Sequence, residues 1–226
     1  RPLVTTGRRP ARDGNARRGH GATLTPSDLP LVAVEQHHID AVLAAVRTPV
    51  ETIWPLSPLQ QGVYFQARYS PAAVYIVQNV FDVAEPIDAD ALRTAYSAVM
   101  HRNPVLRSAF WADGIPQPVA AIAVDPTVDV DVVDLTDHPS IAGELDRLTA
   151  ADRRRTFDLS SAPLARFTVV RTPGHDRLIF SYHFLLLDGW SREQLLRELF
   201  AEYAAARRGE TATVSPPSAQ FTDYLA

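Results

Sequence analysis

The C-terminal third of the chain contains the pattern that most restricts its possible folds. Residues 164–170 and 177–184 are two apolar segments with the composition of strands, and Thr172-Pro173-Gly174 predicts a turn between them. A helix is expected to begin at Ser191, where Gln194 completes a capping box. Two successive strands followed by a capped helix favour a fold built from layers of sheet and helix.

The preceding residues continue this mixture of strands and helices. The strands expected at 106–111 and 117–122 form a hairpin around Asp113-Gly114, and Ser57 with Gln60 predicts a capped helix start. The order of elements predicts an α/β fold, an α+β layered sandwich with a mostly antiparallel sheet flanked by helices. The other expected elements are helices over 35–48, 57–69, 88–102 and 140–154 and strands over 75–83 and 128–133.

Composition excludes several classes of site. The 226 residues contain no cysteine, which excludes disulfides, cysteine-bound metals and a cysteine nucleophile. All 22 basic residues are arginine, so neither a Schiff-base lysine nor a P-loop lysine is present. The net charge of −4 gives no support to nucleic-acid binding. No apolar run reaches about 18 residues, so we expect no membrane-spanning helix and a cytoplasmic protein.

The first 52 residues are expected to precede the compact part of the chain. Residues 1–22 are rich in glycine and arginine, and we interpret them as a disordered basic tail or linker rather than a nucleic-acid-binding arm. Residues 23–52 are interpreted as an interdomain linker with a short helix, and the compact lobe is expected to start at Ile53. His37 and His38 point about 100° apart on that helix, which makes a poor metal site.

Residues 181–191 carry the chemistry that the sequence suggests. In the strand, Phe184 shares a face with the apolar even-numbered residues, and His183 lies on the other face. Asp188 and Gly189 follow at the junction with the last helix, where unpaired backbone N–H groups can face an oxyanion. These residues alone leave two interpretations open, a catalytic turn or a core histidine bonded to backbone beside a structural carboxylate.

The segment YHFLLLDGWS (182–191) resembles the HHxxxDG motif of the condensation domains of nonribosomal peptide synthetases. The segments that resemble other ordered motifs of this family are WPLSPLQQGVYFQ (54–66), MHRNPVLRSAF (100–110), FDLSSAPLARFTVVR (157–171) and QFTDYLA (220–226). The first of these, the opening motif, most resembles the branch that joins a D-configured donor to an L-configured acceptor. In addition, LTPSDLPLVAVEQ (24–36) resembles the linker after an epimerization domain.

The resemblance implies a fold like that of chloramphenicol acetyltransferase, in which two similar lobes form a V with a tunnel between them. Residues 53–226 would be the N-terminal lobe, and the C-terminal lobe is expected to lie outside this sequence. Donor and acceptor peptidyl carrier proteins would deliver phosphopantetheine arms to the tunnel, where the acceptor amine attacks the donor thioester. The domain itself would bind no cofactor and no metal. Its other partners would be the C-terminal lobe and an upstream epimerization domain, with no nucleic acid and no membrane.

One motif position departs from the family pattern. The second histidine of the motif, which faces the tunnel and is usually given the role of general base or positioning group, is replaced by Phe184. A phenyl ring accepts no proton, and loss of a positioned base typically lowers a rate about 10²–10⁴-fold. We therefore expect an acyltransferase by ancestry whose peptide-bond formation is impaired. Since one lobe encloses half a tunnel, this chain alone is expected to be inactive.

The other motif residues are assigned by the same resemblance. His183 matches a chiefly structural histidine, and Asp188 matches a carboxylate whose ion-pair partner would be Arg102 or Arg107. Because breaking a buried pair costs about 3–5 kcal/mol, Asp188→Ala is expected to harm folding more than chemistry. Gly189 is expected to let the backbone approach the thioester. The expected contacts of the substrate or tunnel are Trp190, Ser191, Ser57 and Gln60, with Ser191 as a helix cap rather than a nucleophile.

Two other functions fit parts of the pattern. A non-catalytic condensation-like module that binds carrier proteins or a tailoring enzyme is favoured by Phe184, whereas the other motifs favour an enzyme. An epimerization domain has a similar motif, but such domains open differently from the LSPLQQ segment at 56–61.

Overall fold

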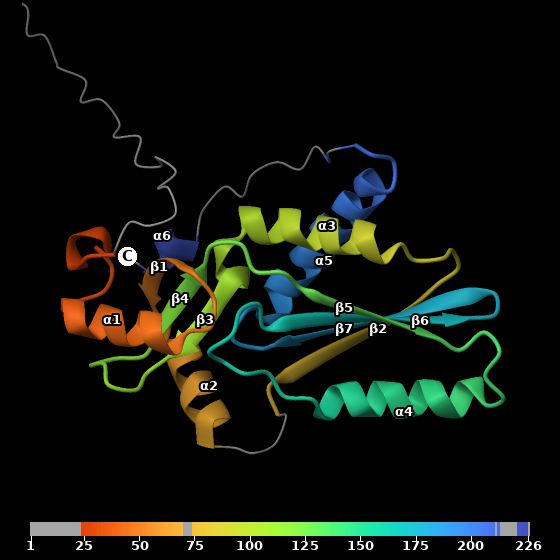
Figure 1. Ribbon diagram of the computed structural model, residues 1–226, viewed down its shortest axis with the longest axis horizontal. Helices are drawn as coiled ribbons and strands as arrows, with labels where there is room; N and C mark the ends of the chain where they lie inside the picture. The colour runs from red at the N-terminus through yellow and green to blue at the C-terminus, as the bar shows by residue number, and fades with distance from the viewer. Residues whose placement is uncertain (1–23, 70–73, 211, 213–220, 226) are drawn as a thin grey trace, which may run out of the picture.

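The computed structural model describes residues 24–69, 74–210, 212 and 221–225, and its strands form two sheets (Figure 1). The three-stranded sheet has the order β1-β4-β3, and the four-stranded sheet has the order β2-β7-β6-β5. Among the described strands, β5 with β6 is the one parallel pair, so the predicted mostly antiparallel arrangement is confirmed. The strands are β1 Val50–Pro55, β2 Ile76–Val83, β3 Ser108–Trp111, β4 Val119–Ala123, β5 Asp129–Asp134, β6 Ala165–Thr172 and β7 His175–His183.

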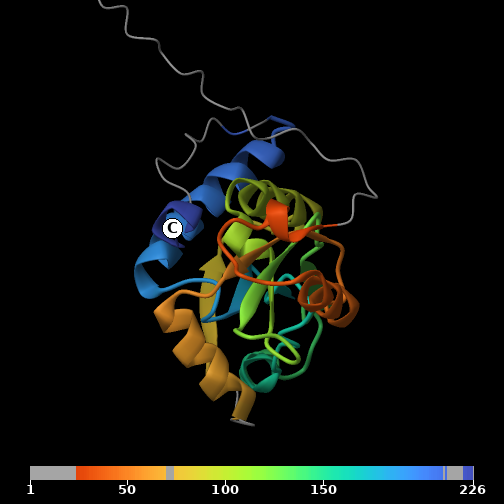
Figure 2. The same cartoon turned by 90° about the vertical axis from the view of Figure 1, so that its left-hand side faces the viewer.

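Helices cover both faces of the four-stranded sheet. α3 and α5 lie side by side on one face (Figure 2), and α4 lies on the opposite face (Figure 1). The side chains of β7 alternate between these layers, as the sequence predicts. Phe180 and Tyr182 enter the main core with α3 and α5, whereas Ile179 meets Leu145 of α4. The helices are α1 Gln36–Ala45, α2 Pro58–Tyr69, α3 Ala89–Arg102, α4 Ile141–Arg154, α5 Gly189–Ala206 and α6 Phe221–Leu225, with 3-10 turns at Pro26–Asp28 and Pro104–Arg107.

A second core lies between the N-terminal segment and the three-stranded sheet. Leu29, Ile39 and Val42 are at most 2% exposed and pack with apolar side chains of β1, β3 and β4. β1 begins at Val50, which pairs with Ala123 of β4, so the three-stranded sheet includes residues on both sides of the boundary expected at Ile53. The expectation for residues 1–22 lies outside the described residues.

Buried charges fasten α4 to the four-stranded sheet. Arg166 Nε on β6 lies 2.6 Å from Asp152 Oδ1 on α4, and their side chains are 3% and 9% exposed. Ser181 and Gln78 also donate hydrogen bonds to the Asp152 carboxylate. Burial disfavours the charge on Asp152, but the hydrogen bonds from Ser181, Arg166 and Gln78 outweigh it and lower the pKa of this carboxyl group. A hydrogen-bonded ion pair therefore replaces apolar contact at this point of the layer.

Candidate active site at the end of strand β7

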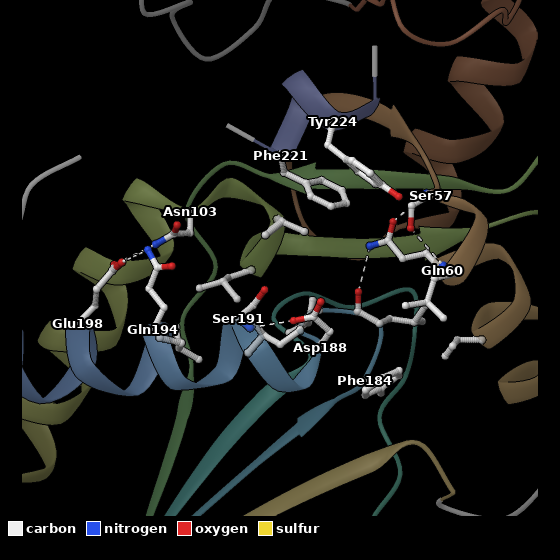
Figure 3. A pocket seen from close by; sticks show the side chains of 18 residues that line it. Ser57, Gln60, Asn103, Phe184, Asp188, Ser191, Gln194, Glu198, Phe221 and Tyr224 are labelled. Carbon is white, nitrogen blue, oxygen red and sulfur yellow. Dashed lines mark hydrogen bonds between the residues drawn. The ribbon is translucent and has the colours of Figure 1, made fainter. Parts of the chain in front are cut away.

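A cavity of about 460 Å³ lies where β7 ends. Its walls come from the loop after β7, the first half of α5, the start of α2, the segment after α3, and α6 (Figure 3). The structure thus brings together side chains that are far apart in the sequence. The residues singled out from the sequence that line this cavity are Ser57, Gln60, Phe184, Asp188 and Ser191.

Ser57 and Gln60 form the predicted capping box at the start of α2. The backbone N–H of Ser57 donates to Gln60 Oε1 at 3.0 Å, and the backbone N–H of Gln60 donates to Ser57 Oγ at 3.2 Å. Gln60 Nε2 also donates to the backbone oxygen of Leu185 at 3.0 Å. The same side chain that caps α2 therefore holds the loop after β7, which gives the cavity two connected walls.

His183 is buried at the last position of β7 and is not among the described residues that line the cavity. Its Nδ1 accepts a hydrogen bond from the backbone N–H of Leu185 at 3.2 Å. Burial lowers the pKa of His183 to about 4, so the ring is neutral near pH 7. An accepting Nδ1 assigns the proton to Nε2. The ring therefore helps to shape the turn after β7 through its hydrogen bond with Leu185.

Phe184 follows directly and lines the cavity. Its backbone N–H donates to the backbone oxygen of Tyr75 at 2.8 Å, which fixes the residue beside the first part of β2. The ring is half-buried and packs against the main core. At the position where the resemblance places a general base, the structure presents a hydrocarbon surface with no proton acceptor.

Asp188 caps α5, which corrects the expected start of this helix. Asp188 Oδ1 accepts from the backbone N–H of Ser191 at 2.8 Å, and α5 begins at Gly189. Ser191 is therefore the third residue of the helix, not its cap, because the carboxylate three residues earlier satisfies its N–H. A Cβ at Gly189 would meet no described atom within 4 Å, so packing within the described chain does not require glycine there. The expectation for the side chain of Trp190 lies outside the described residues.

The prediction that Asp188 forms an ion pair with Arg102 or Arg107 is wrong, because each arginine pairs with a different carboxylate. Arg102 Nη1 lies 2.5 Å from Glu202 Oε1, because α3 packs along α5, and Glu202 is about 21 Å further along that helix than Asp188. Arg107 Nη1 lies 2.7 Å from Glu51 Oε2 on β1 and also bonds backbone oxygens at the end of β4. Each arginine supports packing elsewhere in the lobe.

The cavity also contains functional candidates that the sequence analysis missed. Asn103, Gln194 and Glu198 form a polar group in its wall, and the aromatic side chains of Phe221 and Tyr224 reach it from α6. The spacing of Gln194 and Glu198, four residues apart on one helix, was a usable signal. No comparable sequence signal predicted that α6 approaches the cavity, because this approach depends on tertiary packing.

Two further observations concern metal sites and membrane-spanning helices in the described part of the chain. Its His, Cys, Asp and Glu side chains form no group of three or more that could hold a metal ion. None of its helices is both long enough and apolar enough to cross a membrane.

Comparison with known proteins identifies relatives along most of this chain. The family model described as the condensation domain matches residues 50–226. A linear gramicidin synthase protein of Brevibacillus parabrevis is 36% identical over 208 residues, which cover 89% of this chain and 4% of that protein. Phosphinothricin tripeptide synthetase PhsC of Streptomyces viridochromogenes is 36% identical over 174 residues, or 75% of this chain and 16% of that protein. The chain thus spans a small part of these relatives.

Solved structures agree with this result. The starter condensation domain of rhizomide synthetase RzmA matches with a TM-score of 0.68 and 20% identity, over 77% of this chain and 43% of that one. The first condensation domain of the calcium-dependent antibiotic synthetase matches with a TM-score of 0.62 and 23% identity, over 74% and 40%. These matches confirm the predicted fold class, and with the family model they show that the chain belongs to the condensation-domain family of nonribosomal peptide synthetases.

Proposed function

We propose that this chain is the N-terminal lobe of a condensation domain that forms a peptide bond between two carrier-bound thioesters. The amine of the aminoacyl thioester attacks the carbonyl carbon of the peptidyl thioester, a C–N bond forms, and the C–S bond breaks. The donor arm leaves as a thiol, which takes up the proton that the amine loses. Donor and acceptor peptidyl carrier proteins hold the two arms, and a C-terminal lobe forms the other side of the tunnel. The match to about four tenths of two solved condensation domains supports the assignment to one lobe.

The cavity at the end of β7 is the observation that carries this proposal. Segment 184–188 forms one wall, and Ser57 and Gln60 supply polar groups at one end of a mainly apolar lining. Such a lining suits the thioester end of a phosphopantetheine arm, which combines a hydrocarbon chain with amide groups. The arm arrives on a carrier protein, so the lobe needs no cofactor of its own. A variant of the RzmA starter domain has been solved in complex with C8-CoA.

The residues around the cavity support a role in shaping the substrate site and give little support to a role in proton transfer. Gln60 and His183 hold the loop after β7 through hydrogen bonds to Leu185, and Asp188 holds the first turn of α5. Phe184 occupies the position of the missing base. We infer that peptide-bond formation is slowed about 10²–10⁴-fold relative to a domain with histidine at this position.

Phe184 also favours a second function, a non-catalytic module that binds carrier proteins or a tailoring enzyme. Both functions retain the cavity and the fold. They differ in whether the remaining machinery can perform the reaction once a base is restored. The decisive variant is therefore Phe184→His.

The test uses the protein with both lobes, loaded donor and acceptor carrier proteins, and mass spectrometry of the new peptide. An impaired enzyme is expected to gain product about 100-fold or more in Phe184→His. Phe184→Leu is the matched control, because it changes the volume of the side chain without adding a base. If Phe184→His still forms no peptide but binds the carrier proteins, the result supports the non-catalytic module. If neither carrier protein binds, the enzyme and a carrier-binding module are both rejected.

The finer parts of the proposal rest on the N-terminal half of the sequence. The opening motif at 54–66 supports a D-configured donor and an L-configured acceptor. The segment at 24–36 supports an upstream epimerization domain, which would supply the D-configured donor in the cytoplasm. Analysis of the product configuration by chiral chromatography would test the first assignment.

A further inference from the structure

One end of the cavity is polar, and the charged side chains in the described lining are all acidic. Figure 3 shows Asn103, Gln194 and Glu198 together at the end away from Gln60. Among the described residues of the lining, the charged ones are Asp188 and Glu198, and both are acidic. A charged group entering this cavity therefore meets carboxylates, and the described lining offers it no basic side chain.

Each carboxylate oxygen of Glu198 accepts a hydrogen bond from a neutral amide. Asn103 Nδ2 donates to its Oε2 at 3.2 Å, and Gln194 Nε2 donates to its Oε1 at 3.4 Å. Both amides turn their NH₂ groups to the carboxylate, so their carbonyl oxygens remain as acceptors for another group. A carboxylate has about four acceptor positions, and these two amides fill only part of them.

The nearest cation does not neutralise this end of the cavity. Arg102 Nη2 lies 3.8 Å from Glu198 Oε2, but Arg102 Nη1 lies 2.5 Å from Glu202 Oε1. One guanidinium thus faces two carboxylates, so the cluster of Arg102, Glu198 and Glu202 carries a net charge of about −1 when all three side chains are ionised. The side chain of Glu198 is 13% exposed, so water screens this charge less than it would at the surface.

Aromatic rings complete the environment. Phe184 lines the cavity on one side, and Phe221 and Tyr224 of α6 line it on another. The face of an aromatic ring attracts a cation placed within about 6 Å of the ring centroid. The acidic side chains and the amide carbonyl acceptors of the lining favour a positively charged ligand and disfavour a negatively charged one.

We propose that this cavity selects an amino-acid side chain that ends in an ammonium or guanidinium group, and that Glu198 is the specificity-determining residue. The inference rests on the proposed function, since it assigns the substrate class of the same site. The cationic side chain belongs to the residue on the donor arm or to the residue on the acceptor arm. Both have the same chemistry at their ends, and the ligands of the test distinguish them.

The test measures binding, so it does not depend on whether Phe184 permits turnover. Amides of lysine, norleucine and 2-aminoadipate with aminopantetheine, in which NH replaces the thioester sulfur, are titrated into the two-lobe protein by calorimetry. The three side chains have similar length and end in an ammonium, a methyl and a carboxylate group. Each amide is used with a free α-amine, as in an acceptor, and N-acetylated, as in a donor peptide. The lysyl amide is expected to bind about tenfold more tightly than the norleucyl amide, and the 2-aminoadipyl amide more weakly than both.

Glu198→Gln is expected to remove the preference for lysine with little change in norleucyl binding. The variant should fold, because Arg102 keeps Glu202 as its partner. Glu193→Gln is the matched control, because Glu193 lies on the same helix, is exposed and pairs with Arg192. It should retain the preference.

A lysine preference in the acetylated series assigns the cation to the donor, and one in the free-amine series assigns it to the acceptor. Equal binding of the three amides, or a preference that survives Glu198→Gln, overturns the inference and leaves the proposed function standing. If no amide binds, the inference fails, and the assay with loaded carrier proteins decides the proposed function independently. Should Glu198→Gln lower the melting temperature, the ranking of the three amides by the unaltered protein still decides.

Discussion

Replacing Arg166 with methionine tests how strongly the buried charges hold α4 on the sheet. Methionine keeps much of the apolar stem but removes the guanidinium, which bonds Asp152 Oδ1 at 2.6 Å and two backbone oxygens at 2.6 and 2.7 Å. The Asp152 carboxylate stays buried and keeps the hydrogen bonds from Ser181 and Gln78. Breaking a buried ion pair costs about 3–5 kcal/mol, and the two remaining donors place the expected loss at about 3 kcal/mol.

The measurement is equilibrium urea denaturation followed by circular dichroism. Arg155→Met is the control, because Arg155 is 55% exposed and its nearest carboxylate oxygen, on Asp131, lies 3.5 Å away. This exposed pair should contribute at most about 1 kcal/mol. The double variant Arg166→Met/Asp152→Leu should be more stable than Arg166→Met, because it strands no charge. If Arg166→Met and the control lose equal stability, the assignment of α4 docking to this pair is refuted.

Two further variants test the turn between β7 and α5. Asp188→Ala should lower the free energy of unfolding by about 1 kcal/mol in the same urea assay, because it removes a helix cap; a loss above about 3 kcal/mol would restore the buried ion-pair interpretation. The folded-state pKa of His183, about 4, lies below its unfolded value of 6.5. The unfolded chain therefore binds the proton first, and stability should fall by up to about 3 kcal/mol as the pH drops from 6.5 to 4. His183→Gln keeps an acceptor for Leu185 and should flatten this loss, whereas the exposed control His101→Gln should not; equal pH profiles would contradict the assignment.

Local signals in the sequence predicted the elements that build the cavity. The capping box of Ser57 and Gln60 and the N-cap at Asp88 depend on side chains within three residues of the groups they bond, so sequence spacing is sufficient. The alternation in β7 predicted which side chains enter the main core, because successive strand residues face opposite sides. The tunnel-facing position of Phe184 was indicated by the resemblance and not by the alternation, because β7 ends one residue earlier at His183.

The features that the sequence did not predict depend on contacts between residues far apart in the chain. β1 is six residues long, ends in Pro55 and pairs with β4 far along the chain, so its sequence carries little strand signal of its own. The partner of Arg102 depends on how α3 packs along α5, and a motif comparison carries no information on that contact.

The burial of the N-terminal segment has a consequence for exchanging units between synthetases. A junction at residue 50, the edge of the matched family model, would cut Leu29, Ile39 and Val42 away from the β1-β4-β3 sheet. Both the exchanged unit and its new neighbour would then carry apolar faces without their native cover, and apolar faces of this kind promote aggregation. A junction placed before Leu24 transfers α1 together with the sheet that it covers and leaves the second core intact.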